Sequence, residues 1–155
     1  MTPSFADFLN EDTRHQMNQQ QYPVGSVFVA EFDRSHGIIP KGDDTSRNKM
    51  FIILGHDKKG GLLGSVIINT DPTKHNQTEE FINLQYPLPR HHYDTFLDHT
   101  SYVNCAEIFI INPNTLKRSR HLGTISEDHL EYIIDAVKSS ETITPKILRQ
   151  FALID

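Results

Sequence analysis

The sequence predicts a mainly β fold: a small barrel with C-terminal helices and an N-terminal helical appendage. Three apolar runs rich in β-branched and aromatic residues follow one another at 26–32, 50–54 and 62–70. Two later segments, 130–137 and 147–151, instead repeat apolar residues at helical spacing. Charged residues gather at one end of the three strand-like runs, so we expect a polar site on the rim of the barrel.

Length and composition indicate one domain. The 155 residues suffice for a single hydrophobic core, and we assign residues 23–155 to the barrel and 1–22 to the appendage. No apolar run approaches the roughly 20 residues that span a bilayer, and the N-terminus lacks the pattern of a secretory signal. Cys105 is the single cysteine, and its apolar neighbours predict a buried, inert thiol. We expect a soluble cytoplasmic protein without membrane contact.

The charge distribution is uneven. A net charge of −5 argues mildly against non-specific nucleic-acid binding, which depends on neutralising phosphates. However, Lys117, Arg118 and Arg120 form a basic strip just before an acidic C-terminal segment. Such a strip can bind RNA on an acidic protein.

The appendage combines a helical pattern with a polar stretch. Phe5, Phe8 and Leu9 have the spacing of one or two helical turns, and the glutamine-rich run 16–21 is expected to be a linker. Residues 1–22 are expected either to cover an edge of the barrel or to dock a partner.

The first three strands are separated by one long and one short connection. The loop predicted over 33–48 exceeds the usual length, which is typical of functional loops. It brings Arg47 and Lys49 to the start of the second strand. The run 58–61 ends in two glycines and predicts a hairpin turn. The third strand ends at Thr70.

The next region is less regular. Residues 81–84 predict a short strand, and the prolines of 87–89 should interrupt any regular element. Segments 101–103 and 107–111 predict two strands or one kinked strand, and 112–114 predicts a turn.

The C-terminal helices have clear start signals. Ser126 is a good N-cap, followed by acidic residues that suit the helix dipole. Thr144 precedes Pro145 at the first position of a second helix.

A histidine-rich loop offers an alternative site. His91, His92, Asp94, Asp98 and His99 lie within nine residues. Adjacent histidines diverge in any regular element, and no His-Glu-x-x-His pattern occurs. The loop is open to three interpretations: a metal site, a polar surface or a source of one acid–base group. We expect no metal. Neither a nucleophile elbow nor a phosphate-binding loop is found.

Three of the polar residues near this loop could belong to the rim. Asp98, His99 and Ser101 immediately precede a predicted strand, which places them as candidates beside Thr70. Histidine titrates near neutral pH and suits general acid–base catalysis. The alternative is that Asp98 and His99 cap the strand and pack its loop.

The order of these segments resembles the MazF/PemK family of toxins. The similar segments are 24–32 for the first strand, 49–54 for the second, 63–70 for the third with its terminal Thr70, 101–103 for a Ser-x-Val strand, and 122–126 for the start of a helix. The resemblance covers roughly 24–140 and leaves 72–98 unmatched.

This resemblance implies a dimeric SH3-like barrel that cleaves single-stranded RNA without metal or cofactor, as toxins of type II toxin–antitoxin systems do, and that pairs with an antitoxin protein. In that chemistry a base deprotonates the 2′-hydroxyl, a cation stabilises the phosphorane, and an acid protonates the 5′-oxygen. The resemblance implies that the cation is Lys49, or Arg47 two residues earlier, and that Thr70 hydrogen-bonds the phosphate. From its position we add His99 as a catalytic candidate. From their position or charge we add candidate substrate-binding residues: Asp98, Ser101, Lys117, Arg118 and Arg120.

The sequence departs from the family pattern at the cation. Lys49 and Met50 stand where the family usually has Arg-Pro, and an ammonium cannot make the bidentate phosphate contact of a guanidinium. Two other functions therefore stay open. One is a non-catalytic SH3-like module that binds protein or nucleic acid, and the other is a small metal-using hydrolase built on the histidine loop.

Overall fold

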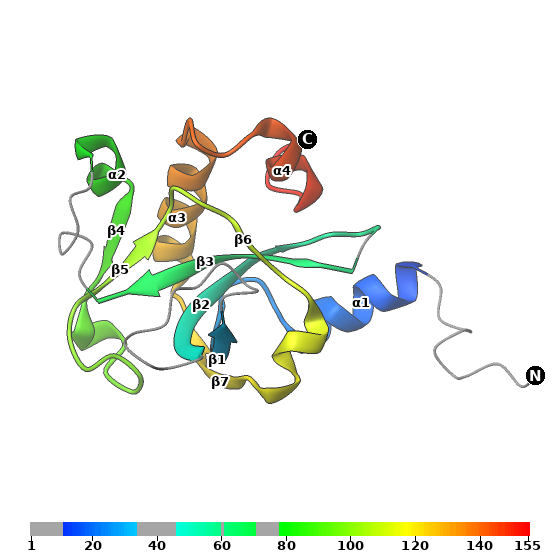
Figure 1. The fold of residues 1–155 in the computed structure, drawn as a ribbon, viewed down its shortest axis with the longest axis horizontal. Coiled ribbons are helices and arrows are strands. Elements are labelled where there is room, and N and C mark those ends of the chain that lie inside the picture. Colours follow the sequence, from blue (N-terminus) through cyan, green and yellow to red (C-terminus); the bar gives the residue numbers. More distant parts are fainter. Residues whose placement is uncertain (1–10, 34–45, 60, 71–77) are drawn as a thin grey trace, which may run out of the picture.

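The computed structural model describes residues 11–33, 46–59, 61–70 and 78–155. Figure 1 shows a bent sheet with two C-terminal helices on one side and a short helix near the N-terminal end. The elements are α1 Glu11–Gln21, β1 Ser26–Asp33, β2 Ser46–His56, β3 Leu63–Asn69, α2 Glu79–Asn83, β4 Gln85–Leu88, η4 Arg90–His92, β5 Ser101–Asn104, β6 Phe109–Ile111, η5 Pro113–Arg118, β7 Arg120–Thr124, α3 Glu127–Ser139 and α4 Pro145–Gln150.

The sheet is antiparallel with strand order β4-β5-β3-β2-β1-β7. Strand β3 pairs with β5 near Ile68 and with β6 near Leu63, so two strands share its second edge. The strands predicted at 26–32, 50–54, 62–70, 101–103 and 107–111 are therefore confirmed, with small changes in their ends. The prediction lacks β7.

Alternation along the central strands fills two hydrophobic clusters. Val27 and Ile52 face the first cluster, where Ile133 of α3 is also fully buried. Phe28 and Phe51 face the second cluster on the opposite side. This two-residue period is what a sheet covered on both faces requires.

The β2–β3 hairpin receives α4. The Asp57 amide donates to the Leu62 carbonyl (2.8 Å), which closes the hairpin predicted at 58–61. Gly60 itself lies outside the described residues. Farther along, Gly55 pairs with Gly64, and Phe151 at the end of α4 lies directly on both.

The polar run 16–21 is part of α1, so the predicted linker is wrong. Glutamine and methionine are good helix formers, and the end of the helix is anchored because Tyr22 is buried and its amide donates to the Asn18 carbonyl (2.7 Å). The side-chain amide of Asn18 also donates to the Gly61 carbonyl (3.3 Å). Helix α1 thus covers the sheet beside β2. The turns predicted at 5–9 lie outside the described residues.

The predicted strand at 81–84 is also wrong, because this segment lies mainly in α2. The Thr78 hydroxyl accepts from the Phe81 amide (3.2 Å), and two glutamates occupy the first turn. Strand β4 follows and includes Pro87, against the prediction of a break at 87–89. Because β4 is an edge strand, it tolerates a residue without an amide hydrogen.

Two predicted connections belong to regular elements. Arg47 and Lys49 are in β2, opposite Phe32 and Ala30 of β1. The loop predicted over 33–48 therefore ends before residue 46, not at 48. Its residues 34–45 lie outside the described residues. The predicted turn at 112–114 instead opens the 3-10 helix η5. Its N-cap Asn112 accepts from the Asn114 amide (2.9 Å).

Both C-terminal helices are confirmed with the predicted N-caps. The Ser126 hydroxyl accepts from the His129 amide (3.4 Å), and the Thr144 hydroxyl accepts from the Ile147 amide (3.3 Å).

Candidate functional site

A pocket of about 450 Å³, here called the rim pocket, lies beside the middle of β1, the first half of β2 and the end of β3, between β7 and the segment before β5. Its apolar lining comes from alternate strand positions such as Val29, Met50 and Ile68. Its polar lining comes from β2, the end of β3, the segment before β5 and the start of β7. The polar residues are Asn48, Lys49, Asn69, Thr70, Thr95, Asp98 and Arg120.

Two positively charged side chains of different kinds line the pocket. The Lys49 ammonium donates to the Asn69 side-chain oxygen (2.8 Å), which orients it from the neighbouring strand. Arg120 begins β7 opposite Val29, and its side chain is exposed. A phosphate in this pocket would meet a point charge on one wall and a planar guanidinium on another.

A carboxylate and a hydroxyl complete the set. Asp98 and Thr70 both line the pocket and are both exposed, although they are 28 positions apart in the chain. The arrangement therefore supplies a proton acceptor, a neutral hydrogen-bond donor and two cations around one concavity. This is what the binding and cleavage of a phosphodiester requires.

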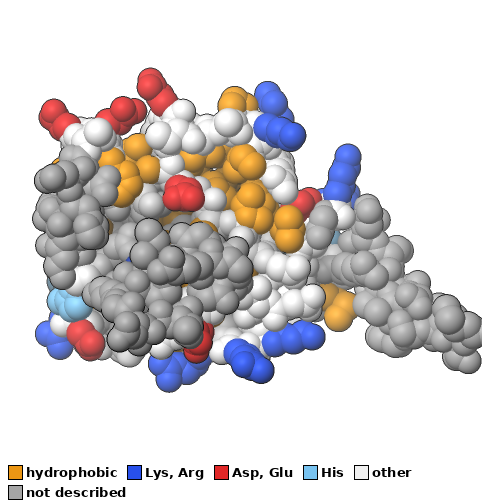
Figure 2. Space-filling model, in the orientation of Figure 1, with side chains coloured by type: hydrophobic (Ala, Val, Ile, Leu, Met, Phe, Trp, Pro, Cys, Tyr) orange, Lys and Arg blue, Asp and Glu red, His pale blue; other side chains and the backbone are white. Residues whose placement is uncertain are grey.

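A second concavity of about 520 Å³ adjoins the first and shares Val29, Asn48 and Arg120 with it. Arg118 at the end of η5 adds another cation there. Figure 2 shows Lys and Arg side chains along the lower margin of the molecule, where η5 and β7 lie in Figure 1. Together the two concavities, here called the basic groove, are lined by the cations Lys49, Arg118 and Arg120 and by the carboxylates of Glu31 and Asp98.

The structure does not bring every predicted site residue to this pocket. Ser101 is only 3% exposed and its hydroxyl donates to the His99 carbonyl (3.2 Å), so it cannot touch a ligand in this conformation. His99 and Lys117 are exposed but line none of the concavities described here. The Arg47 side chain lies outside the described residues.

A network near α3 was not predicted because its members are far apart in the sequence. The Tyr93 hydroxyl is hydrogen-bonded to His129 Nδ1 and to the Ser126 hydroxyl (3.3 Å). Burial lowers the pKa of His129, and nearby His92 lowers it further against the opposing effect of Asp128. Within the histidine-rich loop, the ring of His92 lies 4.3 Å from that of His91 and 5.3 Å from that of His129 between centroids, so His92 links the loop to α3.

Two further observations concern reactive groups. Cys105 is fully buried, as predicted, and this burial raises its pKa to about 12. Within the part of the chain that the structure describes, no three histidine, cysteine, aspartate or glutamate side chains are grouped so as to hold a metal ion.

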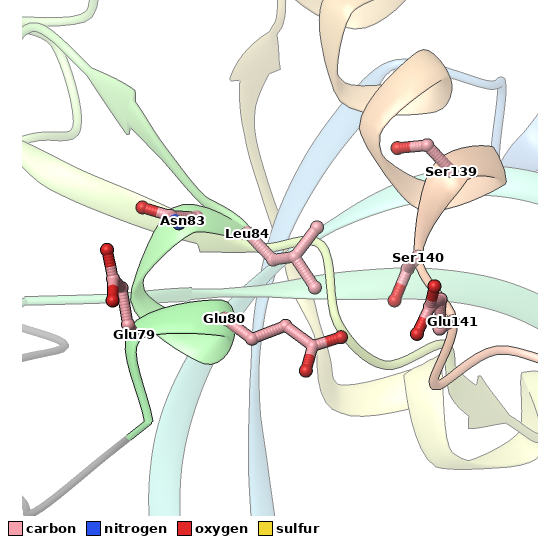
Figure 3. A pocket seen from close by; sticks show the side chains of 7 residues that line it. All are labelled: Glu79, Glu80, Asn83, Leu84, Ser139, Ser140 and Glu141. Carbon is pink, nitrogen blue, oxygen red and sulfur yellow. The ribbon is translucent and has the colours of Figure 1, made fainter.

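An acidic pocket of about 370 Å³ lies elsewhere, between α2 and the end of α3. In Figure 3 the side chain of Glu80 extends from α2 toward the end of α3, where Glu141 lies, and the side chain of Leu84 lies above that of Glu80. Its charge repels phosphates, so we do not assign it to a nucleic-acid site.

The fold, a barrel-like antiparallel sheet with C-terminal helices, is similar to that of a solved structure that contains MazF. A chain of the crystal structure of MazE–MazF (form III) from Deinococcus radiodurans aligns with this protein at a TM-score of 0.51 and 13% identity. The alignment covers 75% of this chain and 92% of that chain, and it confirms the predicted fold class.

No protein-family model matches the sequence of this chain, and no curated protein matches it. Among the described residues, none of the helices combines the length and apolar character needed to cross a bilayer.

Proposed function

We propose that this protein is a MazF-like endoribonuclease that cleaves single-stranded RNA without a metal ion. The observation that carries the proposal is the rim pocket, where Lys49, Thr70, Asp98 and Arg120 converge from four separate parts of the chain. The adjoining basic concavity with Arg118 offers a path for the RNA backbone. The likeness in fold to a MazE–MazF crystal structure supports the same class.

In the proposed reaction the RNA supplies its own nucleophile. Asp98 accepts the proton of the 2′-hydroxyl as that oxygen bonds to phosphorus, while Arg120 and Thr70 bind the phosphate oxygens. The bond from phosphorus to the 5′-oxygen then breaks, and the Lys49 ammonium donates the proton that this leaving group needs. The products are a 2′,3′-cyclic phosphate and a free 5′-hydroxyl.

Assembly with other chains belongs to the same proposal. We expect a homodimer and a cognate antitoxin protein, since the structural neighbour comes from a MazE–MazF complex. Size-exclusion chromatography with light scattering measures the first, and a monomer at all accessible concentrations would contradict it.

The central experiment is cleavage of a labelled single-stranded RNA by purified protein in the presence of EDTA. Removing Arg120 or Lys49 with alanine should slow cleavage by about 10²-fold, the order expected for loss of one transition-state donor. Arg149→Ala is the matched control: Arg149 lies on α4, which packs at the opposite end of the β2–β3 hairpin. Intact RNA with wild-type protein would reject the proposal.

A second function is favoured by the Lys49–Asn69 hydrogen bond. An ammonium held by a neighbouring strand suits static phosphate binding as well as catalysis. In that case the protein is a non-catalytic nucleic-acid-binding module. The same assay separates the two, because RNA would be retained by the protein without being cut.

A further inference from the structure

A third concavity of about 410 Å³ adjoins the rim pocket. The two concavities share Thr95 and Phe96, so the Phe96 ring stands at the boundary between them. The remaining lining of the third concavity is His92, Tyr93, Gly123, Thr124 and Ser126. The third concavity thus extends the rim pocket with an aromatic ring, hydroxyl groups and an imidazole, and its lining contains no Lys or Arg.

The Phe96 ring is displayed by the buried residues around it. Tyr93 and Leu97 are 6% and 2% exposed, and the Leu97 amide donates to the Tyr93 carbonyl (2.8 Å). The turn over 93–97 is therefore anchored at both of its ends, and the Phe96 ring within it is half-buried. The rings of Tyr93 and Phe96 are in contact, 5.6 Å apart between centroids.

A glycine on β7 makes room for this ring. A Cβ atom at Gly123 would lie 2.9 Å from the Phe96 ring, closer than real Cβ contacts come. The ring therefore rests directly on the backbone of β7. The support is rigid, because the Ser126 amide at the start of α3 donates to the Tyr93 hydroxyl (3.1 Å) and ties the turn to the helix.

We propose that Phe96 is a stacking platform for an RNA base beside the phosphate bound in the rim pocket. This inference rests on the proposed function and adds a nucleobase subsite to it. Single-stranded RNA presents splayed bases that stack on aromatic side chains, and a pre-positioned ring reduces the entropy lost on binding. Thr124 and His92 lie within the same concavity and can hydrogen-bond the edge of the base.

The test measures binding, so that it does not depend on cleavage. The probe is a labelled single-stranded RNA with 2′-fluoro groups, which lack the nucleophile, titrated by fluorescence anisotropy. Phe96→Leu should weaken binding by about five- to tenfold, whereas Phe96→Tyr, which keeps the stacking surface, should bind like the wild type. Phe81→Leu on α2 removes a comparable half-buried ring away from the groove and should change nothing.

A second probe, an oligomer of the same length without bases, isolates the stacking. Wild type and Phe96→Leu should bind it equally. Binding of the base-containing RNA that depends on Arg120 but not on Phe96 would overturn this inference alone. An equal loss by Phe96→Leu on both probes would overturn it too, since the effect would not come from a base. Absence of RNA binding by the wild type would reject the proposed function itself.

Discussion

In the proposed reaction, Lys49 and Arg120 together supply the positive charge that a single arginine could supply. The guanidinium of Arg120 can contact two phosphate oxygens at once, whereas the ammonium of Lys49 is a point charge whose position Asn69 fixes. The two residues come from β2 and β7, strands that both pair with β1. In the proposed reaction their roles are therefore not interchangeable.

This difference predicts an asymmetric response to conservative changes. Arg120→Lys loses the planar contact and should lower kcat/KM for RNA cleavage by about tenfold or more. Lys49→Arg keeps the positive charge but releases a proton much less readily, so it should lower kcat with little change in KM. Initial rates on a labelled RNA over a range of concentrations measure both. The same change in KM in the two variants would contradict the division of roles.

The thiol of Cys105 offers a test of the packing around one residue. Because burial raises its pKa to about 12, the folded protein should not react with a thiol reagent at neutral pH. Unfolding in urea should release one reactive thiol per chain, since Cys105 is the single cysteine. Reaction of the folded protein at the rate of a free thiol would disprove the burial.

His56 couples the attachment of α1 to pH. Its Nε2 atom lies 2.8 Å from the Tyr22 carbonyl, which can only accept, so Nε2 carries the hydrogen. Burial lowers the pKa of His56 from its ordinary 6.5, the bond to Tyr22 opposes this, and His15 adds a smaller lowering effect. As pH falls through 6.5, the unfolded chain takes up a proton that the folded one resists, so stability falls.

The His56→Gln variant keeps a donor for Tyr22 but cannot titrate. Its free energy of unfolding in urea should therefore fall less than that of the wild type between about pH 7.5 and about pH 5.5. His99→Gln, at an exposed histidine, is the control and should follow the wild type. A His56→Gln curve parallel to the wild type would refute the coupling.

At the scale of elements, α4 is held where two glycines face each other on β2 and β3. A Cβ atom at Gly64 would lie 2.7 Å from the Phe151 ring, whereas one at Gly55 would lie 2.2 Å from the Phe151 backbone oxygen. The helix end thus approaches the hairpin so closely that no side chain fits beneath it. This contact fixes the C-terminus to the end of the hairpin that is remote from the rim pocket.

The two glycines should respond differently to a second change. Gly64→Ala and Gly55→Ala should each destabilise the protein by about 1–3 kcal/mol through overpacking. With Phe151→Ala in the background, the cost of Gly64→Ala should nearly vanish because the ring is gone, but that of Gly55→Ala should remain. Double-mutant cycles from urea unfolding measure this, and additive costs at Gly64 would exclude the contact.

The elements that sequence predicts best are those whose signals are local. The strands around Val27 and Ile52 and the helices capped by Ser126 and Thr144 follow from alternation and caps. The segment 81–84 was ambiguous because a short apolar run fits a strand or one helical turn equally well. Pro87 was misread because sequence alone does not reveal which strand is at the edge.

The candidate site, too, can be predicted from the sequence only where its signals are local. Lys49 lies in β2, Thr70 directly follows β3 and Asp98 precedes β5, so all three could be named as candidates from their position in the chain. The contact of Tyr93 with His129 and that of Phe96 with Gly123 join residues 27 or more positions apart. Only tertiary packing brings them together.

At the scale of the whole molecule, charge is unevenly distributed, with a net value of −5. On the face in Figure 2, acidic side chains gather at the upper left, in the region of α2 and the end of α3, whereas several basic ones lie along the lower margin beside single acidic ones, and others lie at the upper right. The acidic pocket around Glu80 and the groove around Arg118 are thus separate features. RNA approaching this protein should be oriented by the field before any contact forms.

A groove with three cations predicts a shallow dependence of RNA binding on salt. If Lys49, Arg118 and Arg120 each neutralise one phosphate, the slope of log K against log salt should be about −2 for a single strand. Arg118→Ala should reduce it by about 0.7, and Lys138→Ala on α3 should not change it. Titrations of 2′-fluoro RNA at several salt concentrations give the slopes. A slope near zero would argue against phosphate contacts.

Pro87 also has a consequence for how copies of this protein can associate. The Cys105 amide donates to the Leu84 carbonyl, so alternation along β4 turns Pro87 toward the open edge of the sheet. That edge therefore lacks an amide hydrogen at an outward position. A strand from another molecule would find no continuous ladder there, which protects the protein from polymerising edge to edge at high concentration.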